Sequence, residues 1–236
     1  MTDFEIPVLF SDAHVLVVAK PAGLLSAPDG WQPDLPHLQA LLEPQWGRLW
    51  LVHQLDKDAS GVMVLARTAD ARRGLDVQFA GQEIRKTCHA IVFGEPSWRQ
   101  RTVTLRLTPH RGRRKRTVVD PQGKEARTAL RVLQRFGAFS LLEAVPRTQR
   151  RHQVRVHLFA EGFPVVNDPL YGSATDDHPL PIHRLALHAR RLEYRHPVTG
   201  EWMGFTAPHP PDFAAALENL AAYGDLYADE GVVEEG

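Results

Sequence analysis

The amino-acid sequence predicts an α+β domain in which antiparallel strands dominate. Most of the 236 residues fall into short apolar or β-branched segments separated by turns, which is the pattern of strands. Four other segments carry apolar residues at helical spacing. With 43% hydrophobic and 24% charged residues, the chain can bury a real core, which excludes global disorder.

Strands and turns alternate through the first 93 residues. Lys20-Pro21-Ala22-Gly23 ends the second strand, because proline and glycine interrupt a strand ladder. Thr68 can cap a helix at its N-terminus and Gly81 can end it. The elements expected here are strands at 8–10, 14–19, 51–55, 62–66 and 84–93, and helices at 35–42 and 69–80.

The second part of the chain continues this pattern. Residues 108–124 are expected to form a loop or hairpin rich in Arg, Gly and Pro. Val154 and Leu158 lie four residues apart, which predicts a helix that ends at Gly162. The remaining elements are strands at 102–107, 128–133, 139–145, around 165, 185–189, 192–195 and 203–206, and helices at 150–161 and 211–222.

The sequence reads as one domain over residues 1–223, followed by an acidic, disordered tail at 224–236. No apolar run reaches 18 residues, so no membrane-spanning helix is expected. The N-terminus has no basic region of the kind that begins a secretory signal. Cys88 is the only cysteine, which excludes an intramolecular disulfide and a four-cysteine zinc site within the chain. The cytoplasm is therefore the expected compartment.

The net charge of zero conceals a strong asymmetry along the chain. Residues 99–155 carry 16 basic and 3 acidic side chains, whereas residues 200–236 carry 8 acidic and no basic ones. Such a basic segment is either solvated surface or a face that binds a polyanion. We favour contact with phosphates, and the densest basic cluster contains Arg111, Arg113, Arg114 and Arg116.

Segment 52–66, which reads VHQLDKDASGVMVLA, places a polar loop between two apolar strands. Asp56 directly follows the first strand, where its side chain can project into a cleft. An ordinary Asp-rich turn is the alternative, and the pattern alone favours it. A glycosidase pair formed by Asp56 and Asp58 is another alternative, which we disfavour.

Segment 150–158, which reads RRHQVRVHL, places arginines on one face of the predicted helix. Arg155 could be drawn partly inward, and a half-buried arginine needs a carboxylate partner. A basic surface helix is the alternative interpretation. His53, His152 and His157 do not have the spacing of known zinc motifs, so no metal site is expected.

Together these segments resemble the RluA-type pseudouridine synthases. Segment 52–66 is similar to that family's V-H-R-L-D-x-x-T-S-G signature, and segment 150–172 is similar to its G-R-T-H-Q-I-R-V-H…G-x-P-I-x-G-D-x-x-Y-G block. Further matches, in the family's order, are VVAKPAG at 17–23, RLALHA at 184–189 and HPVTGEWMGFTAP at 196–208.

The resemblance implies an enzyme that isomerises uridine to pseudouridine in RNA without a cofactor. It also implies a mixed, mainly antiparallel sheet with a central cleft and flanking helices. Asp56 matches the family's essential aspartate and Arg155 the arginine that pairs with it. Further residues expected to bind substrate are Lys20, Gln54, Cys88, Arg150 and Tyr171.

The sequence departs from the family's motifs at two places in the expected site. Gln54 stands where the family has an arginine thought to assist base extrusion, and Cys88 stands where a tyrosine would stack on the base. If Cys88 faces the cleft, Tyr171 and Phe205 are candidates for the missing ring. These departures concern the efficiency and the choice of substrate more than the fold.

The partner expected from this resemblance is ribosomal or transfer RNA, bound by a monomer without metal or membrane. The alternative is a catalytically weak RNA-binding or ribosome-assembly factor built on the same scaffold. The family often carries an N-terminal S4-like RNA-binding domain, and none is expected in this chain. RNA affinity would then come from the catalytic domain itself.

Overall fold

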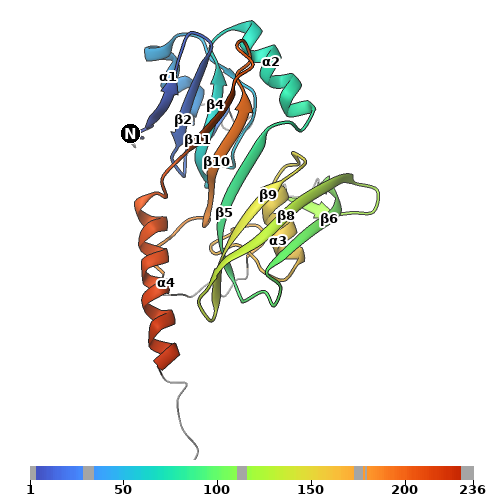
Figure 1. The fold of residues 1–236 in the computed structure, drawn as a ribbon, viewed down its shortest axis with the longest axis vertical. Coiled ribbons are helices and arrows are strands. Elements are labelled where there is room, and N and C mark those ends of the chain that lie inside the picture. Colours follow the sequence, from blue (N-terminus) through green and yellow to red (C-terminus); the bar gives the residue numbers. More distant parts are fainter. Residues whose placement is uncertain (1–3, 29–34, 111–115, 173–177, 179, 230–236) are drawn as a thin grey trace, which may run out of the picture.

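A computed structural model describes residues 4–28, 35–110, 116–172, 178 and 180–229. In this part of the chain, eleven strands form one sheet and four helices flank it (Figure 1). The strands lie in the order β1-β2-β4-β10-β5-β9-β8-β6-β7, with β3 paired to β4 and β11 paired to β10. Apart from the parallel pair β4 and β10, the described pairs are antiparallel. This architecture confirms the predicted α+β class and its mixed, mainly antiparallel sheet.

The N-terminal part of the chain builds one side of the sheet, drawn in blue and cyan in Figure 1. Thr68 caps α2 as expected, because its hydroxyl accepts the backbone N–H of Ala71 at 3.2 Å. The elements here are β1 (Val8–Ser11), β2 (Val15–Lys20), α1 (Leu38–Trp46), β3 (Trp50–Leu51), β4 (Ser60–Ala66) and α2 (Ala69–Ala80).

The strand predicted at 51–55 is wrong beyond its first residue. β3 covers only Trp50–Leu51, after which the chain leaves the sheet. Leu55 satisfies its backbone with a side chain instead of a strand, since its N–H donates to the Ser26 hydroxyl at 3.1 Å and its carbonyl accepts from that hydroxyl at 2.8 Å. The segment that carries Asp56 is therefore a loop fixed to the rest of the protein by Ser26.

The middle of the chain forms a series of antiparallel strands that extends the sheet on the other side (Figure 1). Its strands are β5 (Arg85–Phe93), β6 (Gln100–Pro109), β7 (Thr117–Val119), β8 (Lys124–Arg135) and β9 (Phe139–Pro146). The expected loop or hairpin at 108–124 contains β7, which pairs with the end of β6. Arg111, Arg113 and Arg114, which we expected to bind RNA, lie outside the described residues.

The C-terminal part returns to the centre of the sheet. Its elements are α3 (Gln153–Ala160), β10 (Leu187–Arg195), β11 (Trp202–Thr206) and α4 (Pro211–Asp229). The strands predicted at 185–189 and 192–195 are a single strand, whose register shifts between Ala189 and Arg191. Helix α4 continues seven residues past its predicted end, to Asp229, and residues 230–236 of the expected tail lie outside the described part. No described helix is long and apolar enough to cross a membrane.

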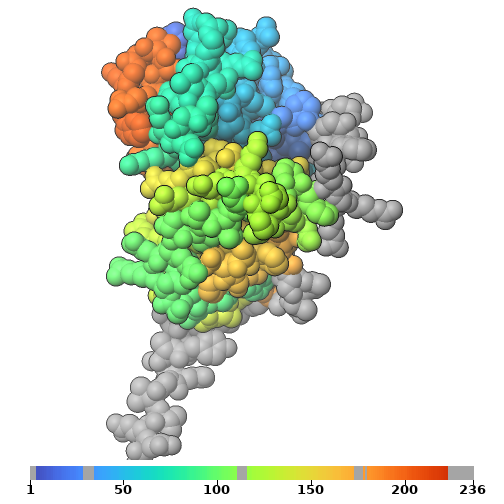
Figure 2. Space-filling model, turned by 90° about the vertical axis from the view of Figure 1, so that its right-hand side faces the viewer, coloured from blue at the N-terminus to red at the C-terminus, as the bar shows by residue number. Residues whose placement is uncertain are grey.

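The parallel pair β4 and β10 brings the N-terminal and C-terminal segments together in the sheet. Gly61 has a φ of 127°, and a Cβ at this position would lie 2.2 Å from the carbonyl oxygen of Ala189. Only glycine permits this approach. Next to it, the buried Ser60 hydroxyl lies 2.9 Å from Nδ1 of His188 on β10. In the space-filling view, the blue and cyan N-terminal part lies directly above the green and yellow middle part (Figure 2).

Candidate active site

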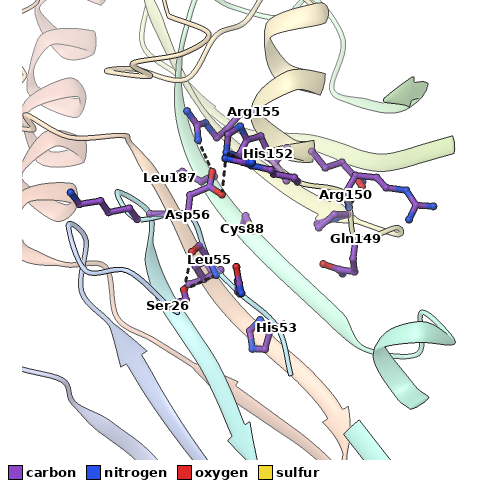
Figure 3. Close-up of a pocket in the computed structure, with 18 of the residues that line it drawn as sticks. Ser26, His53, Leu55, Asp56, Cys88, Gln149, Arg150, His152, Arg155 and Leu187 are labelled. Carbon is purple, nitrogen blue, oxygen red and sulfur yellow. Dashed lines mark hydrogen bonds and ion pairs between the residues drawn. The ribbon is translucent and has the colours of Figure 1, made fainter. Parts of the chain in front are cut away.

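A cleft of about 960 Å³ opens where these parts of the chain meet. The residues that line it come from segments far apart in the sequence: the loops 25–28 and 52–59, Phe79, Lys86 and Cys88, Pro146 and the segment 148–155, the pair Pro169 and Leu170, and Leu187 and Ala189 of β10. Figure 3 shows Asp56 pointing into this cleft toward Arg155 and His152. The central cleft implied by the resemblance is therefore present.

Asp56 and Arg155 form the expected pair. Nη1 of Arg155 donates to Oδ2 of Asp56 at 2.6 Å, although the residues are 99 positions apart (Figure 3). The arginine side chain is 5% exposed, whereas that of Asp56 is 25% exposed. The guanidinium is thus fixed inside the protein, and the carboxylate that it holds reaches the cleft.

Asp168, which sequence reasoning missed, holds the other side of the same guanidinium. Its two carboxylate oxygens accept from Nε and Nη2 of Arg155 at 2.7 and 2.6 Å. Asp168 is fully buried, and its Oδ1 also accepts the backbone N–H groups of Leu170 and Tyr171. Burial alone would lower the pKa of Arg155, but hydrogen bonds and charge from Asp168 and Asp56 raise it above the ordinary value. The arginine is a fixed cation between two carboxylates.

The segment GFPVVNDPLYG at 162–172 contained the signal for Asp168. It places one aspartate in a turn downstream of the arginine helix, and a half-buried arginine needs carboxylates. The sequence could not indicate that Arg155 donates hydrogen bonds to this aspartate as well as to Asp56. That choice depends on how the turn folds back against α3.

His152 is a second residue of the site whose position the sequence did not predict. It precedes α3 with a φ of 53°, in the left-handed region that few residues other than glycine adopt. Its Nε2 lies 3.9 Å from Oδ1 of Asp56, and its Nδ1 lies 3.0 Å from the hydroxyl of Tyr171. Burial lowers the pKa of His152 to about 4, so the ring is neutral at physiological pH.

Gln153 fixes the turn that leads into α3. Its side chain is buried and makes four hydrogen bonds, whose partners are the Thr148 hydroxyl, the Arg150 N–H, the Arg127 carbonyl and the Thr128 hydroxyl. Each polar atom of this buried amide is therefore satisfied. The network locks residues 148–153, and with them His152, against β8.

Two of the expected substrate-binding residues, Lys20 and Tyr171, lie behind the cleft and do not line it. Nζ of Lys20 is surrounded by the carbonyl oxygens of Pro21, Leu24 and Lys57, at 2.8, 2.7 and 3.1 Å. Burial lowers the pKa of this lysine to about 7. These three hydrogen bonds hold Lys20 against the loop that carries Asp56.

Tyr171 has a similar supporting position. Its hydroxyl accepts the N–H of Thr117 at 2.7 Å and donates to the carbonyl of the same residue at 3.0 Å. The guanidinium carbon of Arg155 lies 5.2 Å from the centre of the tyrosine ring. The ring is 4% exposed, so it is not available to stack on a base.

Cys88 and Gln54 line the cleft. Cys88 is buried at the base of the cleft below Asp56 (Figure 3), and burial raises the pKa of its thiol. Phe205, the other candidate for a stacking ring, packs against Phe10 and Tyr194 outside the cleft. Gln54 is exposed, and its side chain makes no hydrogen bond within the described part of the chain.

An aromatic pair that sequence reasoning missed lies at the other end of the cleft. The rings of His53 and Phe79 stack with centres 4.8 Å apart, and both line the cleft. Nε2 of His53 accepts the N–H of Val64 at 3.1 Å. Burial lowers the pKa of His53 to about 3, so this ring is neutral as well.

Basic side chains surround the mouth of the cleft. Arg150 lines the cleft as expected, together with Lys57, Lys86 and Arg151. Arg116, the one described member of the predicted basic cluster, is exposed. A second, smaller depression is lined by Gln82, Thr102, Arg127, Ala129 and Arg147. Arg127 and Arg147 are exposed, and within the described residues their side chains form neither a hydrogen bond nor an ion pair.

The arrangement is suited to chemistry by a carboxylate. Oδ2 of Asp56 is occupied by Arg155, whereas Oδ1 faces the cleft at 3.9 Å from Nε2 of His152. A carboxylate held in place in this way can attack an electrophilic carbon or accept a proton. Among the described residues, no group of His, Cys, Asp and Glu has the arrangement of a metal site.

Comparison with known proteins identifies the family of this site. Residues 14–160 match the profile of the RNA pseudouridylate synthase family. The chain is 38% identical over 233 residues to ribosomal large subunit pseudouridine synthase D of Xanthomonas campestris, covering 92% of this chain and 70% of that protein. It is 37% identical over 225 residues to the protein of the same name from Nitrosomonas europaea, covering 90% and 64%. The chain thus spans slightly less than two thirds of the second relative.

Solved structures agree with this result. The human RNA pseudouridylate synthase domain containing 1 superposes with a TM-score of 0.74 at 25% identity, covering 98% of this chain and 97% of that one. The human RNA pseudouridylate synthase domain containing 4 gives a TM-score of 0.73 at 25% identity, covering 91% and 93%. The chain belongs to the RNA pseudouridylate synthase family, whose enzymes isomerise uridine in RNA, and the alternative of a merely RNA-binding scaffold protein is not favoured.

Proposed function

We propose that this enzyme forms pseudouridine in ribosomal RNA of the large subunit, with Asp56 as its catalytic carboxylate. The observation that supports the role of Asp56 is its geometry. One carboxylate oxygen is held by the buried Arg155 at 2.6 Å, and the other faces an open cleft. The choice of RNA is supported by the names of the bacterial relatives from Xanthomonas and Nitrosomonas.

The reaction rearranges bonds without adding or removing atoms. The bond between ribose C1′ and uracil N1 breaks, the base turns, and C1′ bonds to C5. The proton lost from C5 is balanced by the proton that N1 gains. Oδ1 of Asp56 acts as the nucleophile at the sugar or base, or as the base that removes the C5 proton. Arg155 fixes the direction of the carboxylate through its hydrogen bond to Oδ2.

The target uridine must leave the RNA stack before Asp56 can reach it, at a cost of a few kcal/mol. The cleft of about 960 Å³ is large enough for a flipped nucleotide. Arg150, Arg151 and Lys86 at the cleft, with the exposed Arg127 and Arg147 of the second depression, supply cations for the RNA backbone. Gln54 and Cys88 then contact or adjoin the flipped nucleotide.

The proposed active unit is a monomer, because Asp56, Arg155 and Asp168 of one chain contact one another directly. A ribosomal RNA substrate supports action in the cytoplasm, where bacterial ribosomes assemble. A carboxylate reaction of this kind involves neither oxidation nor hydrolysis, so the proposed mechanism uses no cofactor and no metal.

Mapping pseudouridines in total RNA from cells with and without the gene tests the proposed substrate. A site in large-subunit ribosomal RNA that disappears with the gene supports the proposal, and a site in transfer RNA alone contradicts it. Complementation with Asp56→Asn tests the carboxylate, because asparagine keeps the shape but is neither a nucleophile nor a base. We expect the variant to bind RNA normally and to lose at least about a thousandfold in rate, whereas activity within tenfold of the wild type excludes the role.

A further inference from the structure

The hydrogen bonds around His152 determine which of its ring nitrogens carries the proton. The Tyr171 hydroxyl accepts from the N–H of Thr117 and donates its single hydrogen to the carbonyl of Thr117. His152 Nδ1, 3.0 Å from that hydroxyl, must then be the donor. The neutral ring therefore carries its proton on Nδ1, and the lone pair of Nε2 is an acceptor.

This acceptor points to the place where the reaction occurs. The His152 side chain lines the cleft and is 8% exposed, and its Nε2 lies 3.9 Å from Oδ1 of Asp56 (Figure 3). Nε2 also accepts a hydrogen bond from Nε of Arg151, which is exposed. This hydrogen bond is long, at 3.4 Å. A ligand that brings a hydrogen-bond donor can replace it.

The backbone at His152 is held in a conformation that has a cost. A φ of 53° is unusual for a residue with a Cβ, and such strain persists where the surrounding structure imposes it. Here the imposing contacts are the buried Gln153 network on one side and the Tyr171 hydroxyl on the other. The protein therefore fixes this ring more firmly than a surface turn requires.

The donor that fits this position follows from the chemistry of a nucleotide. If Asp56 Oδ1 approaches the carbons next to the broken bond, Nε2 lies within reach of the groups attached to C1′ and its neighbours. The ring oxygen of the ribose and the O2 of uracil are acceptors, and the N3–H of uracil lies on the far side of the base. The 2′-hydroxyl, on the carbon next to C1′, is the donor at hand.

We propose that His152 is a substrate-positioning residue whose Nε2 accepts a hydrogen bond from the 2′-hydroxyl of the target uridine. Resting on the proposed role of Asp56, this contact orients the ribose while it leaves Oδ1 free to react. It also makes His152 a residue that distinguishes RNA from DNA at the reacting nucleotide, because the 2′-hydroxyl is the group that differs. Burial keeps the ring neutral, so its acceptor is present at physiological pH.

The test uses an RNA oligonucleotide that contains the mapped target and carries either the natural ribose or a 2′-fluoro ribose at that nucleotide alone. Fluorine removes the donor. Wild-type activity on the natural oligonucleotide establishes the proposed function independently. We expect kcat/KM to be lower for the fluoro substrate, and this preference to shrink by about five- to tenfold in His152→Phe, the scale of one hydrogen bond between neutral groups.

Three variants separate this contact from a structural effect. His152→Gln keeps an acceptor near the Nε2 position and should retain the ribose preference; glutamine tolerates positive φ in this protein at Gln82. His152→Asn suits the left-handed backbone but is too short to reach, so it should lose the preference even if the phenylalanine variant fails to fold. His183→Phe, at an exposed histidine outside the cleft, should change nothing. An undiminished preference in His152→Phe or His152→Asn would overturn the proposal.

Discussion

Replacing Arg155 with alanine tests how the catalytic carboxylate is supported. The guanidinium is 5% exposed and lies between Asp56, which is 25% exposed, and Asp168, which is 0% exposed. In the variant Asp56 can turn toward water, whereas Asp168 stays buried and loses two of its charged hydrogen bonds. Breaking a buried ion pair by removing one partner costs about 3–5 kcal/mol, and here most of the cost falls on Asp168.

Urea unfolding followed by circular dichroism measures this loss. With a urea m value of about 3 kcal/mol per molar, the midpoint should fall by about 1 to 1.7 M. Pseudouridine formation should fall as well, since Asp56 loses the donor that directs it. If the variant is already unfolded in buffer, Arg155→Met combined with Asp168→Asn removes the buried charge together with its partner and should recover about half of the stability.

The pair Arg184 and Asp212 provides a matched control. It has the same two-pronged geometry, with distances of 2.7 and 2.9 Å, but its side chains are 15% and 37% exposed. Arg184→Ala should therefore cost about 1 kcal/mol or less. The reasoning fails if Arg155→Ala lowers the midpoint no further than Arg184→Ala does, because burial would then not determine the cost.

Three further predictions follow from the cleft, its surroundings and the buried histidines. Cys88→Tyr should lower KM for RNA by up to about tenfold, because a ring beside Asp56 can stack on the flipped base; an unchanged KM or a destabilised fold would show that the cleft has no room for it. Arg127→Ala with Arg147→Ala should reduce the log–log salt dependence of RNA binding by about 0.7–0.9 per lost phosphate contact, whereas Arg131→Ala, whose side chain is paired with Glu143, should leave the slope unchanged. Burial lowers the pKa of His89, His188 and His209 to about 4, 3 and 4. The unfolded chain takes up these protons near pH 6.5 and the folded protein does not, so the free energy of unfolding should fall from pH 7 to pH 5. The fall should be smaller in His89→Gln, and an equal fall in this variant would contradict the assignment of the effect to His89.

The sequence alone determined the class of fold and the identity of the central pair. The short apolar or β-branched segments indicated the strands because one face or both faces of each strand must be buried, and this requirement is local. Thr68 and Gly81 marked the ends of α2 for the same reason, since capping involves neighbours in the chain. Asp56 and Arg155 emerged from motif order, supported by the rule that a buried arginine needs a carboxylate.

The tertiary structure decided which side chains share the cleft. The local sequence does not indicate that three carbonyl groups surround Lys20 or that the Tyr171 hydroxyl is hydrogen-bonded to the backbone of Thr117. Nor does it indicate that Asp168 accepts two hydrogen bonds from Arg155. The loss of the strand at 52–55 likewise depends on Ser26, 29 residues away from Leu55. These outcomes arise from contacts between segments distant in sequence. Composition and spacing do not distinguish the possible partners of a polar group, whereas the folded chain must pair each buried polar group with a partner within reach.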